Sequence, residues 1–307
     1  MRYDSNQSKE RQNFIDTIIE EEIKMKAKKS LAMALSVAAA CMMLAGSVQA
    51  EETTVDKIIE QGYITMATDA AWAPYEYIGE NGEVDGCDVD LGKAIADALG
   101  VELKIINVSF DTLSTYVDSG EADMILAAMT ITDERKLTMD FSDPYTVAQQ
   151  YIIVADDNDD VTNVEDLAGY TIGTHLGTTG DFLVCDEIDL DDGVLNGTGA
   201  SYAQYKSLTD ACMDLKNGVL QAIVCDGPLA ENLCAVNDGL KCFELTYEDG
   251  HTTDESYGIA VKKGNTALLD KINEILDPIV ADGTFNEYFV NQVEKSSLVS
   301  EDETEAK

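Results

Sequence analysis

Arginine is nearly absent from this 307-residue chain. After residue 50 the sequence has one arginine, Arg135, against 12 lysines and 53 aspartates and glutamates, a formal charge of −40. So acidic a surface repels nucleic acid, and we therefore expect no nucleic-acid partner. A single guanidinium kept in this composition indicates a task that lysine does not perform, namely a planar, two-pronged grip on a carboxylate.

Catalytic and metal-binding motifs are also missing. The two histidines, His175 and His251, lie neither in an HExxH motif nor beside a GxSxG turn. The acidic runs 156–160 and 189–193 lack the spacing of a calcium loop. The sequence has no CxxC pair either. It therefore predicts no catalytic residue, no metal site and no cofactor.

An N-terminal extension and an export signal are expected over residues 1–50. The segment combines a basic stretch, an apolar run and small residues before Glu51, with the natural start at Met25. The alternative is a lipoprotein in which Cys41 carries the lipid. We expect an exported protein, periplasmic or extracellular, with lipid anchoring at Cys41 as the alternative.

Six cysteines follow the export signal: Cys87, Cys185, Cys212, Cys225, Cys234 and Cys242. An even number in an exported protein permits disulfides, but the spacing does not select a pairing. Cys212 and Cys225 occupy apolar positions of a helix and a strand, so they are predicted to be core thiols. Cys234 and Cys242 bracket a short loop and are the first pair to test.

Apolar spacing alternates between strand and helix along the chain. The predicted strands are 63–68, 103–108, 124–129, 151–155, 164–167, 170–173, 222–225, 243–246 and 257–261. The predicted helices are 89–99, 112–117, one through Phe182, 208–215, 229–236, and a long helix from Thr266 that Pro278 kinks or breaks. Such alternation predicts an α/β protein with largely parallel sheets.

Two strand-to-helix turns have the composition of anion sites. Residues 122–130 are predicted to be a buried strand, after which Thr132 caps a helix that contains Arg135. Free backbone N–H groups at that helix start would act together with the guanidinium. The glycine-rich turn 173–180 leads into the next helix, with backbone amides and hydroxyls available to an anion.

The order of the motifs resembles the solute-binding proteins of polar amino acid ABC transporters. The four segments that carry the resemblance are ATDAAWAPY (67–75), GCDVDL (86–91), AMTITDER (128–135) and DFSDPY (140–145). The resemblance covers residues 55–295. It implies a two-lobed periplasmic-binding-protein fold of type II, the Venus-flytrap arrangement, in which two hinge crossovers let the lobes close on a ligand. Lobe 1 is expected to hold residues 51–147 and 252–307, and lobe 2 residues 148–251.

The resemblance also implies an amino acid site, a membrane permease as partner, and a monomer that is not an enzyme. Arg135 would clamp the ligand α-carboxylate, with help from Thr130, the backbone around Ala128, and the amides of Thr178 and Thr179.

The rest of the ligand would meet four other side chains. Asp226 would receive the α-ammonium, and Trp72 and Phe110 would stack on the ligand's side chain. Asp69 would lie where that side chain ends and select a hydrogen-bond donor there. The alternative for Asp69 is that backbone amides satisfy it and that it takes no part in selection.

Two departures from the family pattern leave the ligand open. Cys87 replaces an aromatic ring, and Gly180 replaces a side chain that hydrogen-bonds the ligand in many basic amino acid binders. A dehydratase of the same fold, acting on an aromatic amino acid precursor, is the alternative function. The sensor module of a signalling receptor is a further reading, but no span-length segment follows residue 295.

Overall fold

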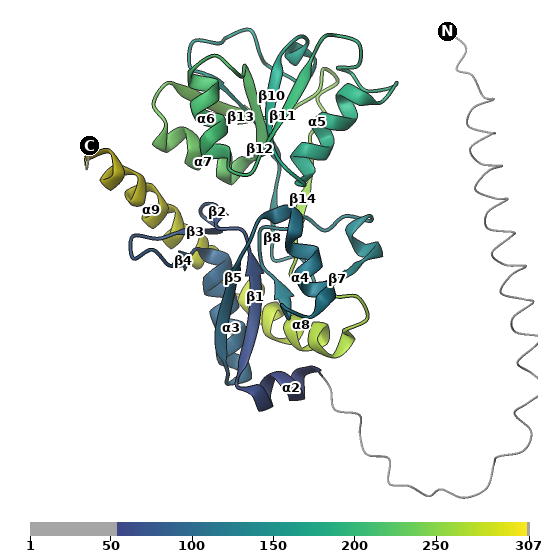
Figure 1. Ribbon diagram of the computed structural model, residues 1–307, viewed down its shortest axis with the longest axis vertical. Helices are drawn as coiled ribbons and strands as arrows, with labels where there is room; N and C mark the ends of the chain where they lie inside the picture. The colour runs from purple at the N-terminus through teal and green to yellow at the C-terminus, as the bar shows by residue number, and fades with distance from the viewer. Residues whose placement is uncertain (1–53, 306–307) are drawn as a thin grey trace, which may run out of the picture. The chain divides into compact units, whose positions relative to one another are not determined.

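The structure, a computed structural model, describes residues 54–305. The expected export signal, the start at Met25, the alternative lipid site at Cys41 and the processed start at Glu51 lie outside the described residues. Two five-stranded sheets carry most of the described strands (Figure 1). We call the first sheet with its helices lobe 1 and the second sheet with its helices lobe 2.

Lobe 1 is a sheet with helices on both faces. In sheet order the strands are β5 (Glu102–Asn107), β1 (Tyr63–Thr68), β6 (Met124–Ile125), β15 (Ala260–Lys262) and β7 (Met139–Phe141). The helices are α2 (Thr54–Gln61), α3 (Cys87–Leu99), α4 (Leu113–Ser119) and α8 (Thr266–Ala281). Met66 packs in the core that contains residues of α3 and α8, whereas the next residue, Ala67, packs in the core that contains α4. This alternation buries both faces of the sheet.

Lobe 2 repeats this layering. Its strands, in sheet order, are β11 (Ser201–Tyr205), β10 (Thr171–His175), β12 (Ala222–Asp226), β9 (Gln150–Ala155) and β13 (Leu240–Glu244). Helix α5 (Thr179–Asp189) lies on one side, and α6 (Leu208–Lys216) and α7 (Gly227–Val236) lie on the other (Figure 1). Val224 packs with Val184 of α5, whereas Cys225 packs with Leu229 of α7.

Two antiparallel strands connect the lobes. Strand β8 (Thr146–Ala148) leads from lobe 1 into lobe 2, and β14 (Glu255–Tyr257) leads back. A small sheet of β2 (Ala71–Trp72), β3 (Glu76–Ile78) and β4 (Val84–Asp85) adjoins lobe 1. The chain ends in α9 (Thr284–Glu305), which contacts α3 and α7.

The prediction of largely parallel sheets is wrong in part, because both sheets are mixed. The order β5-β1-β6 is parallel, but β15 runs antiparallel to both of its neighbours. In lobe 2, β11-β10-β12 is parallel and β9 is antiparallel to β12 and β13. Strands β9 and β15 each follow a crossover. Each therefore enters its sheet from the opposite lobe and runs antiparallel to its neighbours.

Four local features differ from the prediction, the first being that residues 257–261 do not form one strand but belong to β14 and β15. Residues 164–167 form no strand but the short 3₁₀ helix η3 (Glu165–Leu167). Strand β11 was not predicted, because its half-exposed residues lack an apolar run. Helix α8 continues through Pro278 and ends at Ala281.

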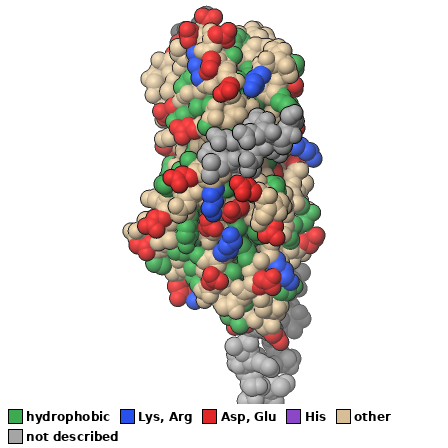
Figure 2. All heavy atoms as spheres, turned by 90° about the vertical axis from the view of Figure 1, so that its left-hand side faces the viewer, with side chains coloured by type: hydrophobic (Ala, Val, Ile, Leu, Met, Phe, Trp, Pro, Cys, Tyr) green, Lys and Arg blue, Asp and Glu red, His purple; other side chains and the backbone are tan. Residues whose placement is uncertain are grey.

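The acidic side chains do not form a single patch on the face of the molecule in Figure 2. Aspartates and glutamates are scattered over that face with a few lysines between them. The negative charge therefore favours solubility without marking a site on this face.

Cys212 and Cys225 are buried core thiols, as predicted, and all six described cysteines are free. Cys234 on α7 and Cys242 on β13 pack against the same core, and their thiols lie close enough to influence each other's pKa. The neighbouring Cys234 thiol lowers the pKa of Cys242, which favours the Cys242 thiolate.

A thiol–disulfide oxidant is expected to join Cys234 to Cys242 before any other pair. The bond would close a short loop and stabilise the fold by about 2.5 kcal/mol. Thiol titration of oxidised protein should show two thiols fewer, and peptide mapping should locate the bond. Cys242→Ser is the control and should keep the remaining thiols titratable. A bond between any other two cysteines would contradict the prediction.

Candidate functional site

Eight of the nine residues predicted to bind ligand line one cavity of about 10 Å³. Lobe 1 contributes Trp72, Phe110, Ala128, Thr130 and Arg135, and lobe 2 contributes Thr178, Thr179 and Asp226. This volume holds about one water molecule. The lobes must therefore separate before a molecule the size of an amino acid enters.

Arg135 begins a single turn of 3₁₀ helix, η2 (Arg135–Leu137), and not the α-helix that was predicted. The chain must reach β7 only two residues later, which leaves no room for a longer helix. Glu134, and not the predicted Thr132, is the N-cap of η2, but Thr132 Oγ1 still accepts a hydrogen bond from the Arg135 backbone N–H at 3.1 Å. One turn offers few free amides, so the guanidinium itself is the main anion-binding group here.

The Arg135 side chain reaches both lobes. Its Nη1 donates to the carbonyl of Thr130 at 2.8 Å, and its Nη2 donates to the carbonyl of Gly177 in lobe 2 at 3.2 Å. The guanidinium carbon lies 5.3 Å from the centre of the Phe110 ring, within cation–π distance. Burial lowers the pKa of Arg135, but a guanidinium stays charged, and three of its five N–H groups remain for a ligand.

Ala128 stands in a turn and not in the predicted strand over 122–130. Strand β6 is only two residues long, and Ala128 then takes a positive φ of 44°, which is unusual for a residue with a Cβ. Its N–H donates to Asp88 Oδ2 at 2.9 Å, which holds the turn. The turn takes the chain out of the sheet, so that Thr130 forms a bridge with Tyr257 and lines the cavity.

The lobe 2 wall is the N-terminus of α5. Thr178 caps this helix, because its Oγ1 accepts from the N–H of Asp181 at 3.3 Å. The first N–H groups of α5 have no partner within the helix, so they are available to an anion. Thr179 Oγ1 lies 3.4 Å from Thr130 Oγ1 of lobe 1, so the two walls touch.

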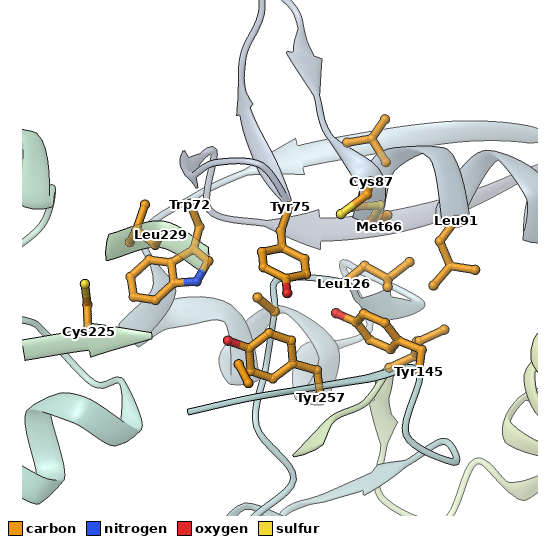
Figure 3. Close-up of a cluster of buried hydrophobic side chains, with 14 of the residues drawn as sticks. Met66, Trp72, Tyr75, Cys87, Leu91, Leu126, Tyr145, Cys225, Leu229 and Tyr257 are labelled. Carbon is orange, nitrogen blue, oxygen red and sulfur yellow. The ribbon is translucent and has the colours of Figure 1, made fainter. Parts of the chain in front are cut away.

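Asp226 ends β12 as a buried carboxyl group. Gln150 Nε2 donates to its Oδ1 at 2.6 Å, and the Tyr257 hydroxyl donates to its Oδ2. Figure 3 shows the Tyr257 hydroxyl directed toward the strand that carries Cys225. Burial, and then the charge of Glu255, raise the Asp226 pKa to about 7.

Asp69 is the one predicted residue that does not line the cavity. Its Oδ2 accepts from the backbone N–H of Phe110 at 2.8 Å and lies 3.5 Å from Nε2 of His175. The His175 ring in turn stacks on Trp72, with ring centres 5.2 Å apart. Burial raises the Asp69 pKa to about 6. Asp69 thus stands behind the aromatic wall.

Sequence reasoning missed four side chains around the site: Gln150, His175, Glu255 and Tyr257. Gln150 Nε2 also contacts Glu255 at 3.3 Å, and a Cβ at Gly180 would lie 2.6 Å from Gln150 Oε1. The Gln150 amide therefore fills the space left by the missing side chain at position 180. Of these four residues, only His175 could have been identified from the sequence, since it lies within the predicted anion-binding turn.

The chain is similar to known proteins along most of its length. The model of the bacterial extracellular solute-binding proteins, family 3, matches residues 64–291. A probable histidine-binding protein of Neisseria gonorrhoeae is 29% identical over 272 residues, which cover 88% of this chain and 97% of the relative. The crystal structure of the amino acid ABC transporter substrate-binding protein AbpA of Streptococcus pneumoniae with L-arginine has a TM-score of 0.71 at 28% identity, covering 78% of this chain and 98% of that one. The ancestral amino acid-binding protein AncCDT-1, a precursor of cyclohexadienyl dehydratase, has a TM-score of 0.69 at 30% identity, covering 78% of this chain and 100% of that one.

This chain therefore belongs to family 3 of the bacterial extracellular solute-binding proteins. The two-lobed fold with two crossovers is confirmed by these structures. No helix within residues 54–305 is both long and apolar enough to cross a membrane. In the same part of the chain, no three or more His, Cys, Asp or Glu side chains are grouped as metal ligands.

Proposed function

We propose that this protein is an extracytoplasmic receptor that binds a polar or basic L-amino acid and delivers it to an ABC importer. One observation carries the proposal: Arg135 of lobe 1 and Asp226 of lobe 2 line the same cavity. A guanidinium matches the ligand α-carboxylate, and a carboxylate matches its α-ammonium. The names of the relatives, which are histidine- and arginine-binding proteins, support an amino acid as ligand.

The two lobes would close on the ligand around the crossover strands. We assign residues 51–147 and 252–307 to lobe 1, 148–251 to lobe 2, and 1–50 to the extension and export signal. Contacts between the lobes already exist at Arg135 and Gly177, and at Thr130 and Thr179. The monomer would then pass the loaded, closed form to its membrane permease, with no nucleic-acid partner.

The most direct test is a thermal-shift screen of the twenty amino acids. A ligand at about 100 times its dissociation constant adds ~2.7 kcal/mol to the free energy of unfolding. We expect a basic amino acid, glutamine or histidine to give the largest increase in melting temperature. No increase with any of the twenty would contradict the proposal.

Asp69 is proposed as the residue that favours ligands with a hydrogen-bond donor at the end of the side chain. One of its oxygens is occupied by the Phe110 N–H, which leaves the other for a ligand. We expect wild type to bind glutamine at least tenfold more tightly than glutamate, because two carboxylates repel each other.

Asp69→Asn removes that repulsion and should bring the two affinities within about threefold. Competition binding measures both ratios, and Asp133→Asn, a change at a fully exposed carboxylate near the site, is the control. If Asp69→Asn had the same ratio of glutamine to glutamate affinity as wild type, backbone amides alone would satisfy Asp69.

A dehydratase is the second candidate, because the structure places an acid–base pair at the aromatic wall. His175 Nε2 and Asp69 Oδ2 lie 3.5 Å apart, and both groups are buried. Such a pair can donate a proton to a leaving hydroxyl group, and AncCDT-1 is related to a dehydratase. Incubation with a hydroxylated cyclohexadienyl carboxylic acid should then give an aromatic product, because the ring loses its protonated hydroxyl group as water and its carboxylate as carbon dioxide. The product is visible by its ultraviolet absorbance and should be absent in His175→Gln.

A further inference from the structure

A buried carboxyl pair lies directly behind the ligand cavity. Glu76 on β3 and Asp88 at the start of α3 are both fully buried. The Glu76 and Asp88 side chains lie within reach of a side-chain hydrogen bond. Two acceptor-only carboxylates cannot form such a bond, so one of the two groups must carry a proton.

The unpartnered atoms of the pair indicate which group carries that proton. Asp88 Oδ2 accepts from the Ala128 N–H at 2.9 Å and from the Tyr145 hydroxyl at 2.8 Å. Asp88 Oδ1 and both oxygens of Glu76 lack a donor in the described part of the chain. A proton on Glu76, directed at Asp88 Oδ1, gives Asp88 a third donor and leaves only one orphan acceptor. Asp88 is then the carboxylate and Glu76 the acid above about pH 7, the value to which burial raises the Asp88 pKa.

The chain is built to bring these two groups together. The Asp88 N–H donates to the carbonyl of Tyr75 at 3.0 Å, which fixes the start of α3 against the strand that carries Glu76. Gly86 allows this approach, because a Cβ there would lie 1.9 Å from the Tyr75 carbonyl oxygen. The N-terminus of α3 also favours a negative charge on Asp88.

No cation balances the pair among the groups that act on it. The titratable groups around it are Asp69, Asp226, Tyr75, Cys87 and Tyr145. Figure 3 shows the rings of Tyr75 and Tyr145 within the same buried cluster, where each lies against the ring of Tyr257. In such surroundings two ionised carboxylates repel each other without screening, so burial and this repulsion raise the pKa of Glu76.

We propose that Glu76 and Asp88 hold one proton between them, and that the resulting Asp88 carboxylate positions the Ala128 turn of the ligand site. Ala128 lines the cavity in a strained conformation, and its one backbone donor is held by Asp88. Glu76 is therefore a positioning residue that acts through Asp88. The link to ligand binding rests on the proposed function, whereas the shared proton does not.

The proton is tested by the unfolding of ligand-free protein, wild type against Glu76→Gln, as a function of pH. The glutamine amide donates to Asp88 as the acid does, but it does not titrate. In wild type the unfolded chain releases the Glu76 proton above its usual pKa of 4.5, whereas the folded protein keeps it. Between about pH 5 and about pH 7, the unfolding constant of wild type should rise about tenfold per pH unit relative to the variant.

Glu80→Gln, at an exposed position of the same hairpin, is the matched control and should give a ratio that is flat with pH. If the ratio of the unfolding constants of wild type and Glu76→Gln also did not change with pH, the shared proton would be overturned.

The positioning role is tested with L-arginine as the probe. Glu76→Met removes the donor, so Asp88 loses its charge or its partner and holds Ala128 less well. We expect the L-arginine dissociation constant to rise more than tenfold, and Glu76→Gln to restore most of that loss. Equal affinities of the two variants would overturn the role. If wild type bound none of the twenty amino acids, the proposed function would fail. The pH dependence of unfolding in wild type and Glu76→Gln would still test the shared proton. The same measurement tests the shared proton if Glu76→Met does not fold.

Discussion

Arg135→Lys is expected to weaken binding of the preferred amino acid by about 30-fold to a few thousandfold. Lysine keeps the positive charge but loses the planar fork that matches a carboxylate. The lysine ammonium also cannot contact the carbonyls of Thr130 and Gly177 at the same time, as the guanidinium does. Loss of one partner of a buried charged contact costs about 2 to 5 kcal/mol, which gives the stated range.

Calorimetric titration of both proteins at the same pH and salt concentration measures this effect. Lys136→Arg is the matched control, because it makes the reverse exchange at an exposed neighbour that pairs with Asp133. The control should bind as wild type does. A loss of less than about threefold in Arg135→Lys, under ~1 kcal/mol, would show that Arg135 is not the carboxylate clamp.

Much of the fold was predictable because its strands are buried and its helices are amphipathic. Strand β1 and helix α3 stand where apolar spacing placed them, and Gly100, directly after the predicted helix 89–99, ends α3 in a left-handed conformation. The direction of β9 and β15 was not predictable, since it depends on where the chain crosses between lobes. The apolar run 122–130 was misleading: its last residues are buried by the fold but leave the sheet.

The site was predictable where a side chain stands in a motif. Arg135, Thr130 and Ala128 belong to one segment, and Asp226 ends a strand, so local sequence identified residues that share one cavity. Gln150 and Glu255 lie in or next to the crossover strands, without a motif of their own. They reach Asp226 only because the two crossovers run side by side. Such neighbours require the tertiary structure.

The two walls of the site are held together by contacts that a ligand must replace. Arg135 donates to the Gly177 carbonyl across the cleft, and Gln150 donates to Asp226. A ligand carboxylate would compete with the first contact, and a ligand ammonium would add a cation beside the second. Opening of the cleft thus breaks hydrogen bonds between protein groups, and ligand binding forms stronger, charge-assisted hydrogen bonds in their place. This exchange favours closure around a zwitterion over closure around an uncharged molecule.

Binding of the amino acid is expected to weaken as the pH falls below about 7, by up to tenfold per pH unit. The Asp226 pKa is about 7 in the empty site, mainly because of burial and then because of Glu255. A bound ammonium favours the ionised carboxylate and lowers this pKa, so binding below pH 7 must release a proton. Above pH 7 Asp226 is already ionised, and the affinity should level off.

The free energy of unfolding of the ligand-free protein should change in the opposite direction and decrease as the pH rises. A carboxyl group whose pKa is raised on folding stabilises the fold at acidic pH, and this contribution is lost as the pH rises from its usual 3.8 through about 7. Asp226 therefore destabilises the empty fold at the pH where it serves the ligand best. This is the pattern expected of a buried charge kept for binding.

Titration calorimetry between pH 5.5 and pH 8, in buffers of different ionisation enthalpy, measures both the affinity and the protons released. Asp226→Asn should bind weakly, by about 30-fold or more relative to wild type at pH 8, because its amide lacks the charge that pairs with the ammonium. It should also lose the proton release that is due to Asp226, whereas release from Asp69, whose pKa is raised to about 6, should remain. Asp133→Asn, an exposed carboxylate near the site, should keep the full pH dependence. A wild-type affinity that stays constant from pH 5.5 to pH 8 would mean that Asp226 is ionised in the empty site, or that it does not meet the ligand ammonium.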